Sequence, residues 1–231
     1  MNPLKTLKML KSFWSLSQDP NRLSEVFAIA DRGSNLKILT EVAKFVSKDP
    51  QGARALREGT RLGKLDLKEL QKLPVGTLGR EFADHMIANG LDPAAIPVPD
   101  HHAGDVRYIK THMRETHDVW HVVTGFHTDV AGEIGLQAFY LAQLPSRLSA
   151  VLISMAFLHL ATKNIAARDA IMTETMRGWA LGKKAKPFFG FDWAAHWDVP
   201  LTEVRAMLGV DTALHATEIP DTQTYVFESA A

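Results

Sequence analysis

Cysteine is absent from the 231 residues of the chain. Its absence excludes disulfides, thiolate zinc fingers, iron–sulfur clusters and a cysteine nucleophile. Any metal site must therefore be built from His, Asp and Glu side chains. The sequence contains 10 histidines, and these are the first candidates for metal ligands.

Further absences narrow the range of functions. Lys and Arg together number 26, as do Asp and Glu, and a chain without surplus positive charge is a poor candidate for nucleic-acid binding. No apolar run reaches the roughly 18 to 20 residues that a membrane-spanning helix needs. The longest uncharged stretch, residues 148–162, contains His159 and two serines. The sequence also lacks the G-x-S-x-G motif of a nucleophile elbow and the G-x-G-x-x-G motif of a dinucleotide-binding loop.

Helical patterns dominate the sequence, and strand-like alternation is hard to find. With 46% hydrophobic residues, the chain can bury a substantial core. We therefore predict one all-α, multi-helix domain of about eight to ten helices. From apolar spacing, capping residues and helix breakers, helices are expected from Ser34 to Val46, from Asp66 to Leu73, from Thr77 to Gly90, and over residues 105–124, 130–143, 147–162, 165–182 and 200–208.

Composition divides the chain into three regions. Residues 1–20 form a basic amphipathic segment, in which three lysines lie between apolar residues at helical spacing. A helix of this kind can lie on an anionic membrane surface, or it can dock on the core with its lysines in water. Residues 21–208 form the helical domain. Residues 209–231 contain Asp and Glu but no Lys or Arg, which predicts an acidic, loosely ordered tail.

His117, Asp118 and His121 form an H-D-x-x-H motif. On a helix the two histidines lie about 40° apart in azimuth and about 6 Å apart along the axis. Both imidazoles then share one face, as in the H-E-x-x-H zinc helix. Asp118 falls between them in azimuth and could be a metal ligand, a carboxylate that orients a ligand, or a catalytic base acting on metal-bound water.

Glu133 follows His121 by twelve residues. On one unbroken helix it would lie about 18 Å farther along the axis. Metal–ligand bonds measure about 2.0 to 2.2 Å, so the chain must turn back for Glu133 to join the histidines. Gly125 can end the first helix, and Thr128 or Asp129 can cap the next. We therefore expect the metal motif on two consecutive helices, with Glu133 in the first turn of the second.

A plainer interpretation of the two histidines stays open. A pair four residues apart often lies on a solvated helix face or forms a satisfied pair in a core. The carboxylates and the helix break favour a metal site. Structural or solvated roles are expected for the histidines without such a pattern, which are His85, His101, His102, His127, His159, His196 and His215.

Residues 114–139 read RETHDVWHVVTGFHTDVAGEIGLQAF. They closely resemble the signature of the coenzyme Q biosynthesis protein 4 family, which is H-D-x-x-H followed by eleven residues and Glu. The segment from Leu73 to Gly79 is similar to the family's L-P-x-G-[ST]-L-G segment, and Phe82 supplies the aromatic residue after it. The C-terminal pattern between Trp179 and Arg205 resembles the family as well, so the similarity covers most of the chain.

The resemblance implies an all-helical protein of ubiquinone biosynthesis that binds a divalent metal, usually zinc. The implied metal ligands are His117, Asp118, His121 and Glu133. It also implies a groove for a prenyl lipid or prenylated quinone precursor, a cytoplasmic protein attached peripherally to a membrane surface, a homodimer, and contacts with other quinone biosynthesis enzymes. His112 and Met113 stand where many members carry Arg and Tyr, so contacts around the substrate ring are expected to differ.

Three functions fit these features. The first is a metal-dependent oxidative decarboxylase of a prenylated benzoate, in which the metal is a Lewis acid. Two histidines and a carboxylate also suit iron(II), so zinc is expected while iron and magnesium stay open. The second is a noncatalytic prenyl-lipid carrier or scaffold, with residues 148–161 lining a channel or filling the core. The third is a zinc-dependent hydrolase, for which Asp118 is shorter than the usual glutamate base.

Overall fold

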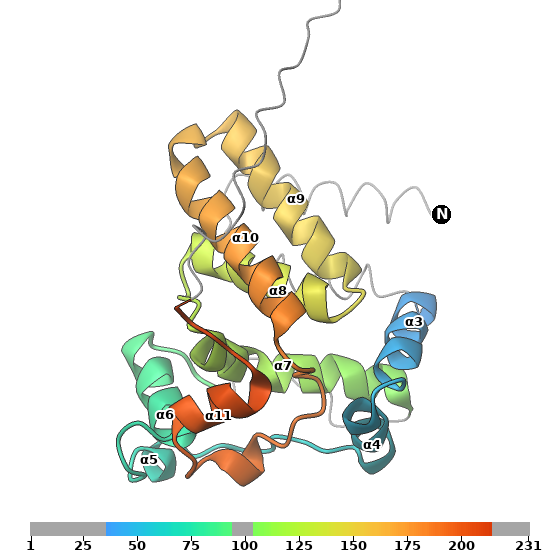
Figure 1. Cartoon of the computed structure of the whole chain (residues 1–231), viewed down its shortest axis with the longest axis vertical. Helices are drawn as coiled ribbons and strands as arrows, with labels where there is room; N and C mark the ends of the chain where they lie inside the picture. The colour runs from blue at the N-terminus through green and yellow to red at the C-terminus, as the bar shows by residue number, and fades with distance from the viewer. Residues whose placement is uncertain (1–35, 94–103, 214–231) are drawn as a thin grey trace, which may run out of the picture.

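The structure, a computed structural model, describes residues 36–93 and 104–213 (Figure 1). In that part of the chain the regular elements are all helical, which confirms the predicted all-α fold. The basic segment 1–20, the histidines His101, His102 and His215, and the tail beyond Ala213 lie outside the described residues.

Nine α-helices and two short 3₁₀ turns make up the described part of the chain. In chain order the elements are α3 (Leu36–Val46), α4 (Pro50–Glu58), α5 (Leu67–Leu70), α6 (Leu78–Ala88), α7 (Asp105–Thr124), α8 (Val130–Gln143), α9 (Arg147–Thr162), η1 (Ile165–Ala167), α10 (Arg168–Lys184), η2 (Ala194–His196) and α11 (Leu201–Leu208). The bounds of α7, α8 and α9 are those that the sequence pattern predicts.

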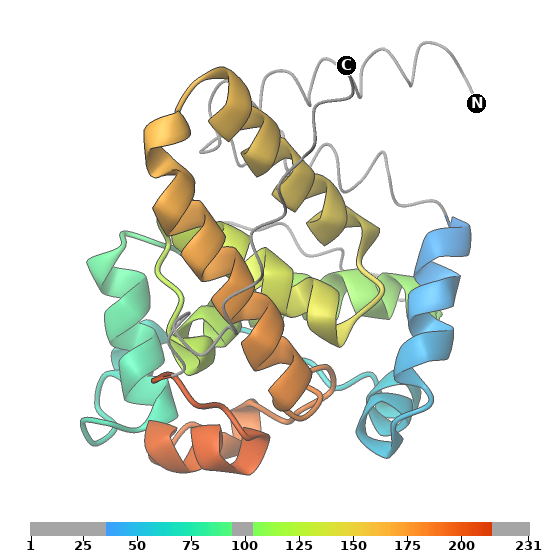
Figure 2. The same cartoon turned by 45° about the horizontal axis from the view of Figure 1, so that its top comes forward.

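Helix α7 runs across the middle of the molecule, and the other helices pack around it (Figures 1 and 2). Helices α3 and α4 lie against one end of α7, whereas α6 and α11 lie against the other. Helices α8, α9 and α10 form a separate layer, in which α9 and α10 are antiparallel. Buried aromatic residues, among them Trp120, Phe139, Phe188 and Trp193, fill the core around α7.

Helices α8 and α10 approach each other closely because glycines line their contact. A Cβ atom on Gly178 of α10 would lie 1.9 Å from the carbonyl oxygen of Gly135 on α8, which is far inside van der Waals contact. One turn later, a Cβ atom on Gly182 would lie 2.7 Å from the Cβ of Ala142. The backbones of these helices are therefore in direct contact, and this sets the short distance between α8 and α10.

Several helix bounds differ from the predicted ones. Helix α4 is absent from the predicted set, although Asp49 caps it by accepting hydrogen bonds from the backbone N–H groups of Gln51 and Gly52 at 2.9 and 3.3 Å. The helix predicted from Asp66 to Leu73 is the single turn α5, followed by turn residues. The helix predicted over residues 165–182 begins as the 3₁₀ turn η1 and continues as α10.

The start of α6 depends on a distant segment of the chain. Thr77 occupies the N-cap position, as predicted, but its hydroxyl donates to the carbonyl of Pro74 and caps no helix N–H. The N–H groups of Leu78 and Gly79 instead donate to the carbonyls of Val199 and Trp197, at 2.9 and 2.8 Å. A backbone segment more than a hundred residues away thus satisfies two of the N–H groups that a helix start leaves unpaired.

Helix α9 is apolar but only half buried. It buries Leu152, Ala156 and Leu160 and leaves Phe157 and Leu158 exposed. It therefore packs on the core through one face, in line with one of its two predicted roles, and the other role, lining a lipid channel, stays a prediction. Among residues 36–93 and 104–213, no helix combines the length and the hydropathy that crossing a bilayer requires.

Candidate metal centre

The predicted reversal between the two motif helices is present. Helix α7 ends at Thr124, and Gly125 follows in the left-handed conformation with φ of 73°, which glycine adopts without steric cost. Asp129 then caps α8 by accepting a hydrogen bond from the N–H of Gly132 at 2.8 Å. Glu133 consequently lies in the first turn of α8, beside the last turns of α7, as the motif spacing requires.

His117, His121 and Glu133 converge in space. One ligand atom from each can be chosen so that the three lie within 4.8 Å of one another. Nε2 of His121 is 3.1 Å from Oε1 of Glu133, and Nε2 of His117 is 3.7 Å from Oε2 of the same carboxylate. The two imidazole rings are 4.8 Å apart and nearly perpendicular. This group could therefore hold a metal ion.

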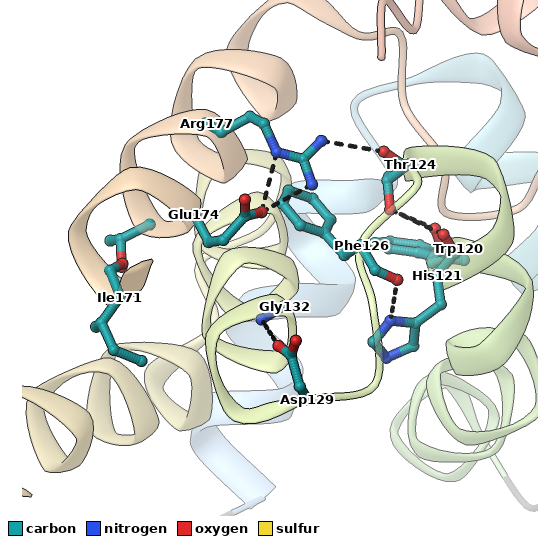
Figure 3. A network of polar contacts seen from close by, with 10 residues as sticks. Trp120, His121, Thr124, Phe126, Asp129, Gly132, Ile171, Glu174 and Arg177 are labelled. Atoms are coloured by element: carbon teal, nitrogen blue, oxygen red, sulfur yellow. Dashed lines mark hydrogen bonds and ion pairs between the residues drawn. The ribbon is translucent and has the colours of Figure 1, made fainter. Parts of the chain in front are cut away.

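The backbone after α7 sets the proton position on His121. Its Nδ1 lies 3.0 Å from the carbonyl oxygen of Phe126, and a carbonyl can only accept a hydrogen bond (Figure 3). Nδ1 therefore carries a proton, and Nε2 faces Glu133. Within the described part of the chain, the buried Nε2 has no partner of hydrogen-bond geometry. A lone pair and a carboxylate at 3.1 Å repel each other unless a proton or a metal cation lies between them.

His117 is held by Tyr140 of α8, which the sequence patterns did not single out. The Tyr140 hydroxyl lies 3.3 Å from Nδ1 of His117, and the two rings are nearly parallel at 6.0 Å. Tyr140 also stacks on Trp120 at 4.3 Å. A signal for Tyr140 does exist in the sequence, because it follows Glu133 by seven residues and so shares its face of α8.

Charge and burial act in opposite directions in this group. Burial acts to raise the pKa of Glu133, but the imidazoles of His117 and His121 that face its oxygens outweigh it and hold that pKa well below its usual value. Burial likewise opposes protonation of His117, but the carboxylates of Glu133 and Asp118 raise the pKa of His117 above 6.5. Burial, reinforced by the same carboxylates, raises the pKa of Tyr140 well above its usual value. The centre therefore holds an ionised carboxylate and attracts a positive charge.

Asp118 does not belong to the convergent group of three. It lies on α7 at the wall of a small cavity of about 30 Å³, together with Arg114, Glu115 and residues of the segment Leu62–Leu65. Its negative charge still acts on the centre by raising the pKa of His117. Its roles as a ligand, an orienting carboxylate or a base remain predictions.

His85 of α6 is a neighbour of the centre that the sequence patterns did not suggest. Its ring lies 6.1 Å from that of His121 and nearly parallel to it. Its Nε2 is buried and has no hydrogen-bond partner among the described residues. Burial and the nearby His121 lower the pKa of His85. No local pattern could have linked the two residues, because they are 36 positions apart and meet only through the packing of α6 on α7.

His112, one of the two departures from the family pattern, belongs to a separate buried network. The N–H of Gly190 donates to its Nε2 at 3.1 Å, so its Nδ1 carries the proton and faces the Tyr108 hydroxyl at 3.3 Å. That hydroxyl donates to the carbonyl of Thr60 at 2.8 Å. On α7, His112 lies about 140° in azimuth from His117. It therefore joins two loops to α7 on another side of the helix.

His112 is expected to make the protein less stable as the pH falls. Burial lowers the pKa of His112 from 6.5 to about 4. Between these pH values the unfolded chain binds a proton that the folded chain rejects, so the free energy of unfolding decreases with falling pH, by up to about 3 kcal/mol from this residue. Denaturant unfolding from pH 7 to pH 4 should show a shallower decrease for His112→Gln, whose amide can make both hydrogen bonds. His196→Gln controls for the loss of one imidazole, and equal slopes for His112→Gln and the parent chain would refute the prediction.

The comparison with protein families gives one match over most of the chain. The model of the family described as "Coenzyme Q (ubiquinone) biosynthesis protein Coq4" matches residues 4–213. A relative from Rattus norvegicus, "Ubiquinone biosynthesis protein COQ4 homolog, mitochondrial", is 31% identical over 182 residues, which is 76% of this chain and 65% of the relative. The chain thus spans slightly less than two thirds of that relative. The Caenorhabditis elegans protein "Ubiquinone biosynthesis protein coq-4, mitochondrial" is 29% identical over 83% of this chain and 84% of its own length.

A solved structure has the same fold. It is the crystal structure of a proposed ubiquinone biosynthesis protein from Nostoc punctiforme, at 2.85 Å resolution. The two structures superpose with a TM-score of 0.77 over 89% of this chain and 98% of the other, with 32% sequence identity.

Proposed function

The chain belongs to the coenzyme Q (ubiquinone) biosynthesis protein Coq4 family, and from this we propose that it is a metal-binding and prenyl-lipid-binding protein that acts in the oxidative decarboxylation of a prenylated benzoate. In that reaction carbon dioxide leaves the ring and a hydroxyl group from water takes its place, while dioxygen accepts the two electrons released and becomes hydrogen peroxide. The observation that carries the proposal is the convergence of His117, His121 and Glu133, with their ligand atoms within 4.8 Å.

The donor set fits a divalent cation of the zinc or iron class, because it offers two imidazole nitrogens and one carboxylate. When bound, such a cation supplies Lewis acidity that stabilises negative charge on the substrate ring. Residues of this chain orient and charge the ligand atoms that would hold the cation. Phe126 keeps the lone pair of His121 Nε2 directed at the centre, and the lowered pKa of Glu133 keeps its carboxylate ionised. The Tyr140 hydroxyl, 3.3 Å from His117, orients that ring and can hold a proton beside the centre.

The alternative function is a noncatalytic prenyl-lipid carrier or a scaffold for other quinone biosynthesis enzymes. Apolar side chains that remain exposed on α9 and α10 support it, namely Phe157, Leu158, Met172 and Trp179. Peripheral attachment to a membrane surface and a homodimer belong to the same proposal, since either would cover such residues. The names of the relatives describe mitochondrial proteins, and a cytoplasmic location of this chain stays a prediction. The hydrolase alternative depends on Asp118 as the base, and its side chain is one carbon shorter than the glutamate of the H-E-x-x-H motif.

Mass spectrometry of protein purified from its native host tests the proposal. We expect about one zinc or iron per chain and a prenyl lipid or prenylated aromatic acid in the organic extract. Decarboxylation in a reconstituted assay separates the enzyme from the carrier, since both bind lipid and only the enzyme releases carbon dioxide. Protein that carries neither metal nor prenyl lipid would contradict both functions.

A further inference from the structure

The C-terminal end of α7 is held by arginine side chains from two other helices. A helix leaves its last four carbonyls without partners inside the helix, and in α7 all four have one elsewhere. The carbonyl of His121 accepts from the N–H of Gly125 at 2.8 Å. The remaining three carbonyls accept hydrogen bonds from arginine side chains. Arg205 of α11 donates to the carbonyls of Val122 and Val123, both at 2.9 Å. Arg177 of α10 donates to the carbonyl of Thr124 at 3.4 Å.

Arg177 makes a second contact that Arg205 lacks. Its guanidinium carbon lies 3.8 Å from the centre of the Phe126 ring, which is 1% exposed (Figure 3). A guanidinium group over an aromatic face is attracted by the ring quadrupole, and more strongly where water is excluded. Glu174 fixes the orientation of the guanidinium, because its carboxylate accepts from Nε and Nη2 of Arg177 at 3.0 and 2.8 Å.

Phe126 is confined by α8 as well as by α10. A Cβ atom on Gly135 would lie 2.5 Å from Cε1 of the Phe126 ring, so the ring lies directly against the α8 backbone. The ring therefore has little freedom to move while Arg177 covers it. The carbonyl of the same residue is the group that accepts the hydrogen bond from Nδ1 of His121 at 3.0 Å.

We infer that Arg177 is a positioning residue for His121: by fixing Phe126, it fixes the carbonyl that accepts the hydrogen bond from Nδ1 of His121 and so keeps Nε2 directed at Glu133. The inference rests on the proposed metal-binding function in assigning Nε2 to a metal. The contacts run from Arg177 on α10 through Phe126 in the loop after α7 to the imidazole of His121, and Figure 3 shows these three residues side by side. Among the described residues, the hydrogen bonds and ion pairs of Arg177 go to Glu174 and Thr124, and none goes to His121 or Glu133.

The competing explanation is that Arg177 only caps α7. Arg205 provides a matched control, because it bonds two carbonyls of the same helix end and has no part in the contact with Phe126. Both arginines carry the same charge near the centre. Loss of a positive charge would by itself strengthen the binding of a cation, so weaker metal binding after the loss of Arg177 cannot be an effect of charge.

The experiment compares Arg177→Met, Arg177→Lys and Arg205→Met in the full chain. Two-bond ¹H–¹⁵N correlation spectra of the metal-free, histidine-labelled protein, recorded at a pH at which the imidazole is neutral, report which nitrogen of His121 carries the proton. Competition with a chromophoric chelator measures the affinity for zinc and cobalt(II). Denaturant unfolding measures the stability of each variant.

We expect Arg177→Met to abolish the single Nδ1–H tautomer of His121 and to lower zinc affinity by about 10- to 100-fold, the range seen when a residue that orients a metal ligand is lost. Arg177→Lys, which can still cover the ring, should show a smaller loss. Arg205→Met should lower the unfolding midpoint and leave tautomer and affinity unchanged. An unchanged tautomer in Arg177→Met, or equal losses of affinity in the two Met variants, would overturn the inference. Absence of zinc binding in the parent chain would instead overturn the proposed function, while the tautomer would still test the positioning.

Discussion

Replacement of Glu133 by Gln is expected to lower zinc affinity by more than 100-fold and to abolish decarboxylation. Glu133 is the one carboxylate in the convergent group, and both imidazoles face its oxygens. Gln keeps the size of the side chain but removes the negative charge that a divalent cation requires. Loss of a residue that merely orients a ligand costs about 10- to 100-fold in affinity, so loss of a ligand should cost more. Chelator competition and carbon dioxide release from a prenylated benzoate measure the two effects.

Glu203→Gln is the matched control, because Glu203 is an exposed carboxylate on α11 and the substitution is identical. It should bind zinc as the parent chain does. A Glu133→Gln variant that binds zinc with parental affinity would show that the three side chains do not form a metal site.

Asp118→Asn separates two of the three roles predicted for Asp118, the metal ligand and the base. If the carboxylate is a metal ligand, zinc affinity should fall as far as in Glu133→Gln. If it acts as a base, turnover should be lost while zinc affinity changes little. We expect turnover to be lost with little change in zinc affinity. Asp118 is not one of the three convergent side chains, and its negative charge acts by raising the pKa of His117.

Gly178→Ala is expected to destabilise the fold by about 3 kcal/mol, the upper end of the usual cost of overpacking. The added Cβ would lie 1.9 Å from the carbonyl oxygen of Gly135. Neither atom can rotate away, because the α10 backbone fixes the Cβ and the oxygen is part of the α8 backbone. The higher helix propensity of Ala offsets only about 1 kcal/mol of the steric cost. Urea unfolding of the metal-free protein measures the difference. Because Gly135 follows Glu133 by two residues, displacement of α8 should also weaken zinc binding.

Met172→Ala is the control for this prediction. Met172 lies on the same helix, and its side chain is exposed. A surface substitution of this kind usually changes stability by less than about 0.5 kcal/mol. Equal stability of Gly178→Ala and the parent chain would mean that α8 and α10 do not approach as closely as described.

Local signals in the sequence were enough to predict the helices that carry the metal motif. Gly125 ends α7, Asp129 caps α8, and Glu133 follows in the first turn. Each of these features depends on residues within one or two turns of each other, so spacing and capping rules apply to them directly. The start of α6 shows the limit of such rules. Thr77 has the residue type of an N-cap, but the carbonyls of Val199 and Trp197, and not its side chain, accept the hydrogen bonds from the first N–H groups of α6.

The sequence by itself determined that this protein is all-helical, that a metal site in it has only His, Asp and Glu to use, and that His117, His121 and Glu133 are candidates for one site. Only the tertiary structure decided which side chains surround them. Tyr140, His85 and Arg177 come from three different helices. Their places near the centre depend on how helices separated by tens of residues pack, and glycine contacts between α8 and α10 set part of that packing. Helical periodicity encodes which face of a helix is buried, but it does not encode which helix covers that face.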